Sequence, residues 1–170
     1  LIDRYKERAM TLALRMLKDR QDAEEAAQDA FVRAYHALGK FEGTAKFGSW
    51  LYRIVYNVCL TRIAKRKDAM TSLRYDDELG YEEIEECSSP TLEHEIETKD
   101  MIHLMKNIVD GLPEKYATML SLFYFQELSH EEICEVTRLP LGTVKVHLFR
   151  ARALLHERLS KELSMEHVTV

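Results

Sequence analysis

Aromatic and cationic side chains gather between Phe41 and Asn57, in a segment that starts as a loop with two glycines and continues into a helix. Holding an unpaired base requires stacking surfaces and a pocket, because these must return the energy lost when the base leaves its stack. Cationic side chains hold phosphates, and a side-chain amide can read a base edge. We therefore expect a surface for unpaired nucleic acid formed by Phe41, Lys46, Phe47, Trp50, Tyr52, Arg53 and Asn57.

Several of these residues also have structural interpretations. Trp50 and Phe47 are large apolar groups that a small domain would pack at least in part. The basic end of the same helix, which carries Arg62, Lys65 and Arg66, either contacts phosphates or complements the helix dipole. For Arg53 and Asn57 we favour nucleic-acid binding, because they share a stripe that core packing does not explain.

A second candidate surface lies near the end of the chain. Ser129 and Glu132 have the spacing of a capping box, and the turn from Arg138 to Gly142 leads into a long final helix. A helix-start signal followed by a turn and a second helix is typical of a helix-turn-helix. The outward side chains of the final helix are predicted to be Lys145, Val146, Phe149, Arg150 and Arg152, and the inward ones Leu141, Val144, Leu148, Leu155 and Leu159. Long polar side chains and an apolar group for a thymine methyl suit a major-groove reader, although Phe149 could instead pack on the preceding helix.

Apolar periodicity predicts helices throughout and no strand. The expected helices span residues 1–17, 22–38, 49–67 and 101–109, followed by one that Pro113 opens, a short one after Ser129 and the final one. The second helix carries an alanine stripe and is predicted to start at Asp22, with Glu25 completing a capping box. The fold class is therefore all-α.

Charge divides the chain into three parts. Residues 1–67 hold fourteen Lys and Arg against eight Asp and Glu, whereas residues 68–100 hold two against twelve. The net charge of −5 thus combines a basic first part with an acidic middle part. The overall negative charge is therefore weak evidence against DNA binding. We predict two small helical domains, 1–67 and 101–170, joined by a flexible acidic linker at 68–100, with a four-helix second domain that ends in the helix-turn-helix.

Two separated segments resemble a known family. The stretch Asp22-Ala-Glu-Glu-Ala-Ala-Gln-Asp-Ala-Phe-Val-Arg-Ala-Tyr, with Phe41-Glu-Gly, Phe47-Gly-Ser-Trp50-Leu-Tyr-Arg-Ile and Asn57, resembles conserved region 2 of the extracytoplasmic-function (ECF) sigma factors of the sigma-70 family. The stretches Leu112-Pro-Glu, Glu127-Leu-Ser-His-Glu-Glu-Ile and Gly142-Thr-Val-Lys-Val-His-Leu-Phe-Arg-Ala-Arg are similar to region 4. Both lie in the family's order, which is more specific than either motif alone.

The resemblance implies a role for each domain. The first domain would bind the clamp coiled-coil of core RNA polymerase and melt the minus-10 element, and the second would read the minus-35 element and contact the flap. The minus-10 set would be the loop residues named above with Arg62, Lys65 and Arg66, and Asn57 would line the pocket for a flipped base. The minus-35 set would be Thr143, Lys145, Val146, His147, Phe149, Arg150 and Arg152. The polymerase-binding set would be Glu25, Gln28, Asp29, Val32 and Arg33.

Val146 and His147 depart from the family's pattern, because many members carry Ser and Arg there. We expect this departure to change base preference or weaken a phosphate contact. The implied partners are core RNA polymerase, double- and single-stranded promoter DNA and a cognate anti-sigma factor, with the chain monomeric in the holoenzyme.

The remaining features predict no enzyme, metal or cofactor. Cys59, Cys87 and Cys134 lie far apart without a CxxC pair, and the histidines lack metal-ligand or triad spacing. The sequence has no apolar run of membrane length and no leader, so we expect no membrane insertion and a bacterial cytoplasmic location, with an anti-sigma factor as the route to any membrane attachment.

Two other interpretations remain open at this point. A helix-turn-helix regulator would bind duplex DNA without polymerase and would self-associate. The aromatic loop favours a sigma factor over such a regulator, since a regulator has no need to hold single strands. A helical adaptor that binds only proteins would use the same helices, but the outward Lys145, Arg150 and Arg152 argue against it.

Overall fold

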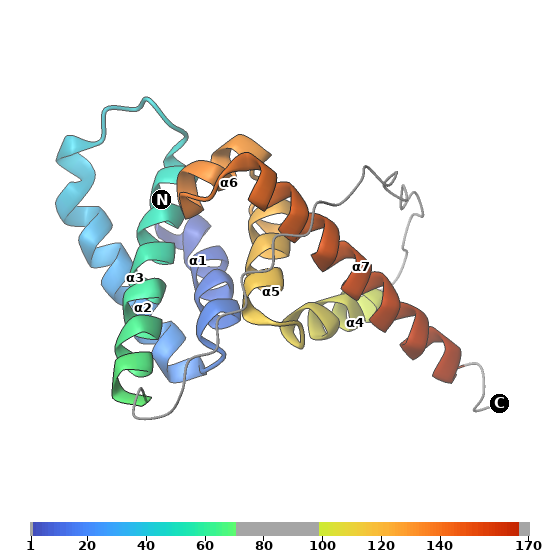
Figure 1. Cartoon of the computed structure of the whole chain (residues 1–170). Helices are drawn as coiled ribbons and strands as arrows, with labels where there is room; N and C mark the ends of the chain where they lie inside the picture. The colour runs from blue at the N-terminus through green and yellow to red at the C-terminus, as the bar shows by residue number, and fades with distance from the viewer. Residues whose placement is uncertain (1, 71–98, 167–170) are drawn as a thin grey trace.

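The computed structural model of the chain describes residues 2–70 and 99–166. Within these ranges all regular structure is helical and no strand forms, which confirms the predicted all-α fold. Figure 1 shows that the first three helices lie side by side and that the helices of the second half pack against one side of them. No helix in the described part of the chain is long and apolar enough to cross a membrane.

The first half is a bundle of three helices, α1 (Ile2–Leu17), α2 (Arg20–Ala37) and α3 (Phe47–Met70). The alanine stripe predicted on α2 is buried: Ala23, Ala26, Ala27, Ala30 and Ala34 face the core. Small side chains let neighbouring helices approach closely, and α2 accordingly packs against both α1 and α3. A short 3-10 turn, Leu38–Lys40, ends α2 and leads into the loop before α3.

The predicted start of α2 at Asp22 is wrong. Asp19 is the N-cap residue: its carboxylate accepts a hydrogen bond from the Asp22 backbone N–H, at 2.8 Å. Lys18, with a positive φ of 55°, turns the chain between α1 and this cap. The Asp22 side chain is free to point elsewhere and pairs with arginines of α3.

The second half contains α4 (Lys99–Asp110), α5 (Glu114–Leu120), α6 (His130–Thr137) and α7 (Leu141–Glu166). Pro113 is the N-cap of α5, in agreement with the predicted helix start there. A π-helical turn, Ser121–Phe125, follows α5 and was not predicted. Most of the predicted linker, residues 68–100, lies outside the described residues, although α3 continues to Met70 and α4 begins at Lys99.

The helix-turn-helix forms from local signals. Ser129 and Glu132 make the predicted capping box: the Ser129 hydroxyl accepts from the Glu132 N–H, and the Glu132 carboxylate accepts from the Ser129 N–H. Arg138 ends α6 in the left-handed conformation, with φ of 59°. The prediction that Leu141 packs inward is wrong, because it is 40% exposed at the first turn of α7, whereas Val144, Leu148 and Leu155 are buried.

The two halves share one core. Leu12, Met16 and Val55 of the first half belong to the same buried cluster as Leu122 and Ile133 of the second. A second cluster lies under α4, α5 and α7 and includes Ile108, Leu112, Leu120, Ala151 and Leu155. In this structure the halves are therefore packed together, so that α6 lies against α3 and α5 against α1.

Cys59 lies in the shared core as a free thiol, and Cys134 is a half-buried free thiol on α6. Burial raises the pKa of the Cys59 thiol to about 12, so its reactive thiolate is scarce at neutral pH. Cys87 lies outside the described residues.

The alanine stripe generates a stability prediction. Ala26→Leu should lower the free energy of unfolding by about 1–3 kcal/mol, because extra carbon atoms in a well-packed core displace its neighbours. Ala64 of α3 is exposed, so Ala64→Leu makes the same chemical change without the crowding and serves as the control. Urea denaturation of both variants measures the difference, and equal effects would contradict the close packing of α2.

Candidate nucleic-acid interface

A pocket of about 180 Å³ opens between the loop before α3 and the second half of the chain. Its lining includes Lys40, Phe41, Trp50 and Arg53 from the first half and Glu135 of α6 from the second. Aromatic rings, cations and small polar groups thus surround one small concave space. The sequence predicted Phe41, Trp50 and Arg53 as a group, but neither Lys40 nor Glu135.

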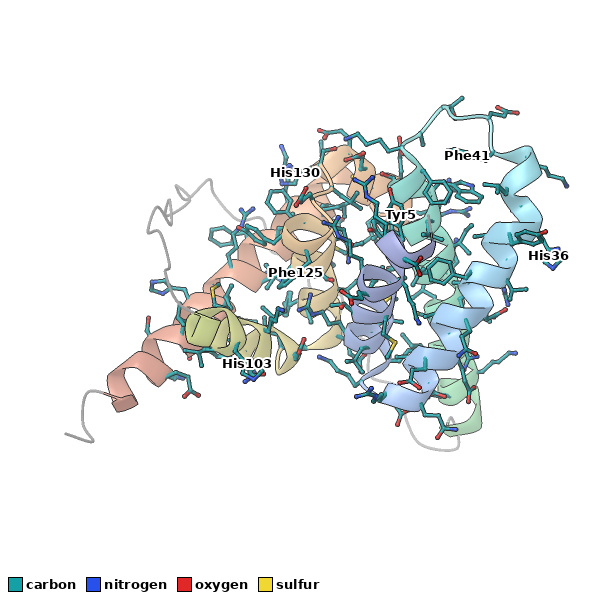
Figure 2. All side chains as sticks on the ribbon, turned by 180° about the vertical axis from the view of Figure 1, so that it is seen from behind. Tyr5, His36, Phe41, His103, Phe125 and His130 are labelled. Atoms are coloured by element: carbon teal, nitrogen blue, oxygen red, sulfur yellow. The ribbon has the colours of Figure 1, made fainter. Side chains whose placement is uncertain are left out.

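The aromatic residues of this region contact one another. The Phe41 and Trp50 ring centroids are 4.9 Å apart, and Phe47 lies 5.5 Å from Trp50 and 5.8 Å from Phe41. Tyr5 of α1 closes the cluster at 5.3 Å from Phe47, and Figure 2 shows it at the same end of the bundle as Phe41. Phe41, Phe47 and Trp50 are each half-buried, so they have both a packing role and an open face.

Tyr52 occupies a different place from its predicted companions. Its side chain is 1% exposed and lies in the shared core, with its ring 6.1 Å from that of Tyr5. Burial raises the pKa of its hydroxyl. A ring in this position contacts protein and is not open to a nucleic acid.

The polar residues of the predicted minus-10 set are mostly at the surface. Arg53, Asn57 and Lys65 are exposed on α3, and within the described residues Arg53 has no hydrogen-bond or ion-pair partner. Lys46, in the loop, is also exposed but binds Glu132 of α6, at 3.2 Å from Nζ to Oε1. Arg53, which lines the pocket, is therefore free to bind another group, and so is Lys40, for which the described residues also provide no partner.

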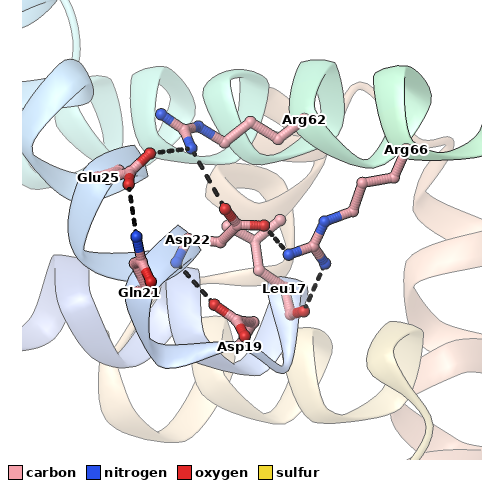
Figure 3. A network of polar contacts seen from close by, with 7 residues as sticks. All are labelled: Leu17, Asp19, Gln21, Asp22, Glu25, Arg62 and Arg66. Atoms are coloured by element: carbon pink, nitrogen blue, oxygen red, sulfur yellow. Dashed lines mark hydrogen bonds and ion pairs between the residues drawn. The ribbon is translucent and has the colours of Figure 1, made fainter. Parts of the chain in front are cut away.

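Arg62 and Arg66 are committed to a network inside the first half, which Figure 3 shows from close by. The Arg62 guanidinium lies 3.2 Å from a Glu25 carboxylate oxygen and 3.7 Å from one of Asp22. Arg66 pairs with the other Asp22 oxygen and donates to the Leu17 carbonyl, at 3.1 Å. The network joins the ends of α1, α2 and α3. In this arrangement the two arginines hold the bundle together, which is a second use for residues that were predicted to bind phosphates.

The exposed face of α2 carries the residues predicted to bind polymerase. Gln28, Val32 and Arg33 are exposed, with Val32 at 55%, and Asp29 forms two short contacts to the Arg33 guanidinium, at 3.0 and 3.1 Å. Glu25, besides its bond to Arg62, accepts a weak hydrogen bond from Gln21 at 3.4 Å.

Tyr35, at 77% exposed, belongs to the same outward face. Its apolar ring on a solvent-facing helix is the signal that could have added it to the set.

The final helix presents its predicted residues unequally. Lys145 and Phe149 are exposed, whereas Thr143, Val146, His147, Arg150 and Arg152 are half-buried. Arg152 lies over the rings of Phe123 and Tyr124, at 5.1 and 5.7 Å, and donates to the Tyr124 hydroxyl. The His147 ring lies 6.3 Å from that of Tyr116, and burial, with the charges of Lys115 and Arg150, lowers its pKa. Lys145 and Phe149 are therefore the best-presented candidates for contacts with duplex DNA.

In the part of the chain that the structure describes, no group of three or more His, Cys, Asp and Glu side chains is placed to hold a metal ion. The features that the structure does bring together are an aromatic pocket with a free cation, an exposed α2 face and the outer face of a helix-turn-helix.

The network on α3 generates a test of its structural role. In a double-mutant cycle of Asp22→Ala and Arg66→Ala, we expect a coupling energy of about 0.5–1 kcal/mol in unfolding experiments, because a partly exposed ion pair is screened by water. Lys65→Ala, on the exposed side of the same helix, is the control. Strictly additive losses would show that the two side chains do not stabilise each other.

Comparisons with known proteins match both halves of the chain. The family model described as sigma-70 region 2 matches residues 1–69, and the one described as sigma-70 region 4 matches residues 102–155. The chain is 34% identical to the ECF RNA polymerase sigma factor SigW of Bacillus subtilis, over 94% of this chain and 87% of that protein. It is 33% identical to the RNA polymerase sigma-H factor of Pseudomonas aeruginosa, over 94% of this chain and 84% of the relative.

Solved structures show a similar fold. The sigma factor RpoE of Bartonella quintana, solved in complex with the anti-sigma factor NepR, superposes with a TM-score of 0.65 at 20% identity, over 94% of this chain and 98% of the other. CnrH, solved in complex with the cytosolic domain of CnrY, gives a TM-score of 0.60 at 21% identity, over 94% and 85% of the two chains. Both matches take in the helices of the two halves. Together with the two family models and the sequence relatives, they place this chain in the ECF group of the sigma-70 family: it is an alternative sigma factor of RNA polymerase.

Proposed function

We propose that this sigma factor recognises a promoter with two surfaces, the pocket at the start of α3 for the melted minus-10 element and the outer face of α7 for the minus-35 element. The observation that carries the proposal is the pocket, where Phe41, Trp50, Arg53 and Lys40 line one small space. Rings provide stacking, and cations neutralise phosphates. An amide for reading a base edge is available from Asn57, which is exposed on the same helix.

The size of the pocket supports a small planar guest. At about 180 Å³ it is smaller than the roughly 300–1,000 Å³ of sites for drug-sized ligands. One base that has left its stack is a group of suitable size and shape. The half-buried state of Trp50 and Phe47 favours this use, because rings fixed by packing lose little entropy when a base stacks on them.

For the minus-35 element we propose Lys145, Phe149 and Arg150 as the principal contacts. Lys145 is exposed for phosphates or base edges, and Phe149 offers an apolar surface for a thymine methyl. Thr143, Val146 and His147 flank them with smaller exposed areas. Arg152 would join them only by leaving its contacts with Phe123 and Tyr124.

For polymerase binding we propose the α2 face of Gln28, Asp29, Val32 and Arg33, extended by Tyr35. Val32 and Tyr35 are exposed apolar groups beside a fixed ion pair, a combination that favours a protein partner over plain solvation. We propose the clamp coiled-coil as the partner of this face and the flap as the partner of the second domain. The two domains would be residues 1–67 and 101–170, with the acidic segment as their linker.

We further propose that an anti-sigma factor holds the chain inactive until a signal releases it. Two proteins with the same fold have been solved in complex with such a partner or with the cytosolic domain of a second protein. The location would be the bacterial cytoplasm, where core polymerase works, with membrane attachment only through the anti-sigma factor.

In vitro transcription with core polymerase on a pool of promoter sequences tests the function. We expect start sites that appear only when this chain is added, and the selected sequences then define its two elements. Duplex DNA binding by a dimer of the chain, without any polymerase-dependent start site, would favour a helix-turn-helix regulator instead.

Variants on a promoter selected in this way should separate the two surfaces. Arg53→Ala should reduce open-complex formation about 10-fold or more with little effect on initial duplex binding, since it removes a free cation of the pocket. Lys145→Ala should weaken initial binding and reduce its salt dependence by about one phosphate contact. Permanganate reactivity of unpaired thymines and filter binding measure the two steps. Identical defects in both variants would argue against the division of labour.

A further inference from the structure

The pocket of the first half is bordered by an acidic edge of the second. Glu135 of α6 lines the pocket beside Arg53 and Trp50. One turn earlier on α6, the Glu132 carboxylate binds two groups of the first half through Oε1: Lys46 Nζ at 3.2 Å and the Ser49 hydroxyl at 3.1 Å. Two carboxylates of the helix-turn-helix thus lie where the loop and α3 present their cations.

Glu132 makes the contacts that a nucleic-acid phosphate would make. A carboxylate oxygen that accepts from an ammonium group and from a hydroxyl has the charge and the acceptor geometry of a phosphate oxygen. Partial burial acts to raise the Glu132 pKa, but hydrogen bonds from the Ser129 N–H, Lys46 and Ser49 outweigh it and hold the pKa below its ordinary value. Glu132 is therefore ionised at neutral pH. While Lys46 is paired with Glu132, it cannot bind a phosphate.

Further contacts between the halves hold α6 in this place. Gln126, just before α6, is buried and donates its side-chain N–H to the Arg8 carbonyl, at 3.1 Å. At the other end of α1, Lys18 donates to the Asp110 carbonyl, at 2.6 Å. The acidic edge is therefore fixed by an interface that spans α1 and α3, and it is not the chance position of one side chain.

We propose that α6 is an intramolecular lid, in which Glu132 takes the place of a DNA phosphate on Lys46 and Glu135 adds a second negative charge at the minus-10 pocket of the free chain. The proposal rests on the function proposed above for that pocket. The lid keeps the free sigma factor from binding single strands, and it opens when the second half moves to its own DNA or protein contacts. The Lys46 side chain is 79% exposed, so its pair with Glu132 is weak and salt-sensitive, as a releasable contact must be.

The test uses single charge-neutralising variants of the full chain. Glu132→Gln keeps an oxygen that can accept from the Ser129 N–H, so the cap of α6 survives while the ion pair with Lys46 is lost. Glu135→Gln removes the charge at the pocket. The matched control is Glu131→Gln, one charge removed from the same helix, because Glu131 is exposed and lies near His130 and Lys145 rather than the pocket. Circular dichroism verifies that each variant stays folded.

Two readouts separate the lid from the function. Trp50 is the single tryptophan of the chain and lines the pocket, so acrylamide quenching of its fluorescence reports on coverage without any DNA. Fluorescence anisotropy with a single-stranded oligonucleotide that carries the minus-10 sequence reports on binding. We expect Glu132→Gln and Glu135→Gln to increase quenching and to lower the dissociation constant about 3- to 10-fold each, with Glu131→Gln near the parent.

The outcomes are distinct. Increased quenching with no single-strand binding by any variant would support the lid and count against the proposed minus-10 function. Equal gains in binding for all three variants, with unchanged quenching, would overturn the lid, because only the net charge would then matter. Binding by the parent chain as tight as by the two lid variants would overturn it as well.

Discussion

The buried guanidinium of Arg15 determines how the two halves of this sigma factor meet. Its side chain is 3% exposed, although it lies on α1 of the first half. Within residues 2–70 and 99–166, its polar partners both come from the second half: Asp110 accepts at 2.9 Å and Ser121 at 3.0 Å, and the Phe125 ring lies 4.0 Å from the guanidinium carbon. Burying a charge without partners costs several kcal/mol of free energy. The Arg15 guanidinium must therefore either bind these groups of the second half or be exposed to water.

The position of α6 follows from this constraint. With Arg15 bound to the end of α4 and the start of the π-helical turn, the chain that continues from that turn must pass over α1 and place α6 against α3. The apolar cluster shared by both halves stabilises the arrangement, and the ion pairs at its rim, such as that of Lys46, are exposed and weak. The interface therefore combines a specific buried anchor with a rim that salt or a competing partner can break.

Local signals in the sequence predicted the elements well, because their causes lie within a few residues. The capping box of Ser129 and Glu132, the helix start at Pro113 and the alanine stripe of α2 are examples. The start of α2 was mistaken because Asp19 and Asp22 are both acceptable caps, and only the arginines of α3 decide which one turns away. Leu141 was expected inside since its spacing fits the apolar stripe of α7, but the first turn extends beyond the core.

The candidate site was predictable in kind but not in arrangement. Aromatic and cationic residues between Phe41 and Arg53 indicated the surface, and the structure places Phe41, Trp50 and Arg53 in the lining of one pocket. The burial of Tyr52, the pairing of Arg62 and Arg66 within the bundle and the presence of Glu135 at the pocket all depend on segments far away in the sequence. Periodicity and caps carry no information on such contacts, and only the packed chain reveals them.

The most direct measurement of this account is the distance between the two halves, with and without polymerase. Spin labels at Ala64→Cys of α3 and His156→Cys of α7, both exposed, can be introduced in a chain whose native cysteines are replaced. Double electron–electron resonance should give one narrow distance distribution for the free chain and a different one in the complex with core polymerase and promoter DNA. A broad distribution in the free chain, unchanged when polymerase is added, would contradict the closed arrangement that Arg15 anchors.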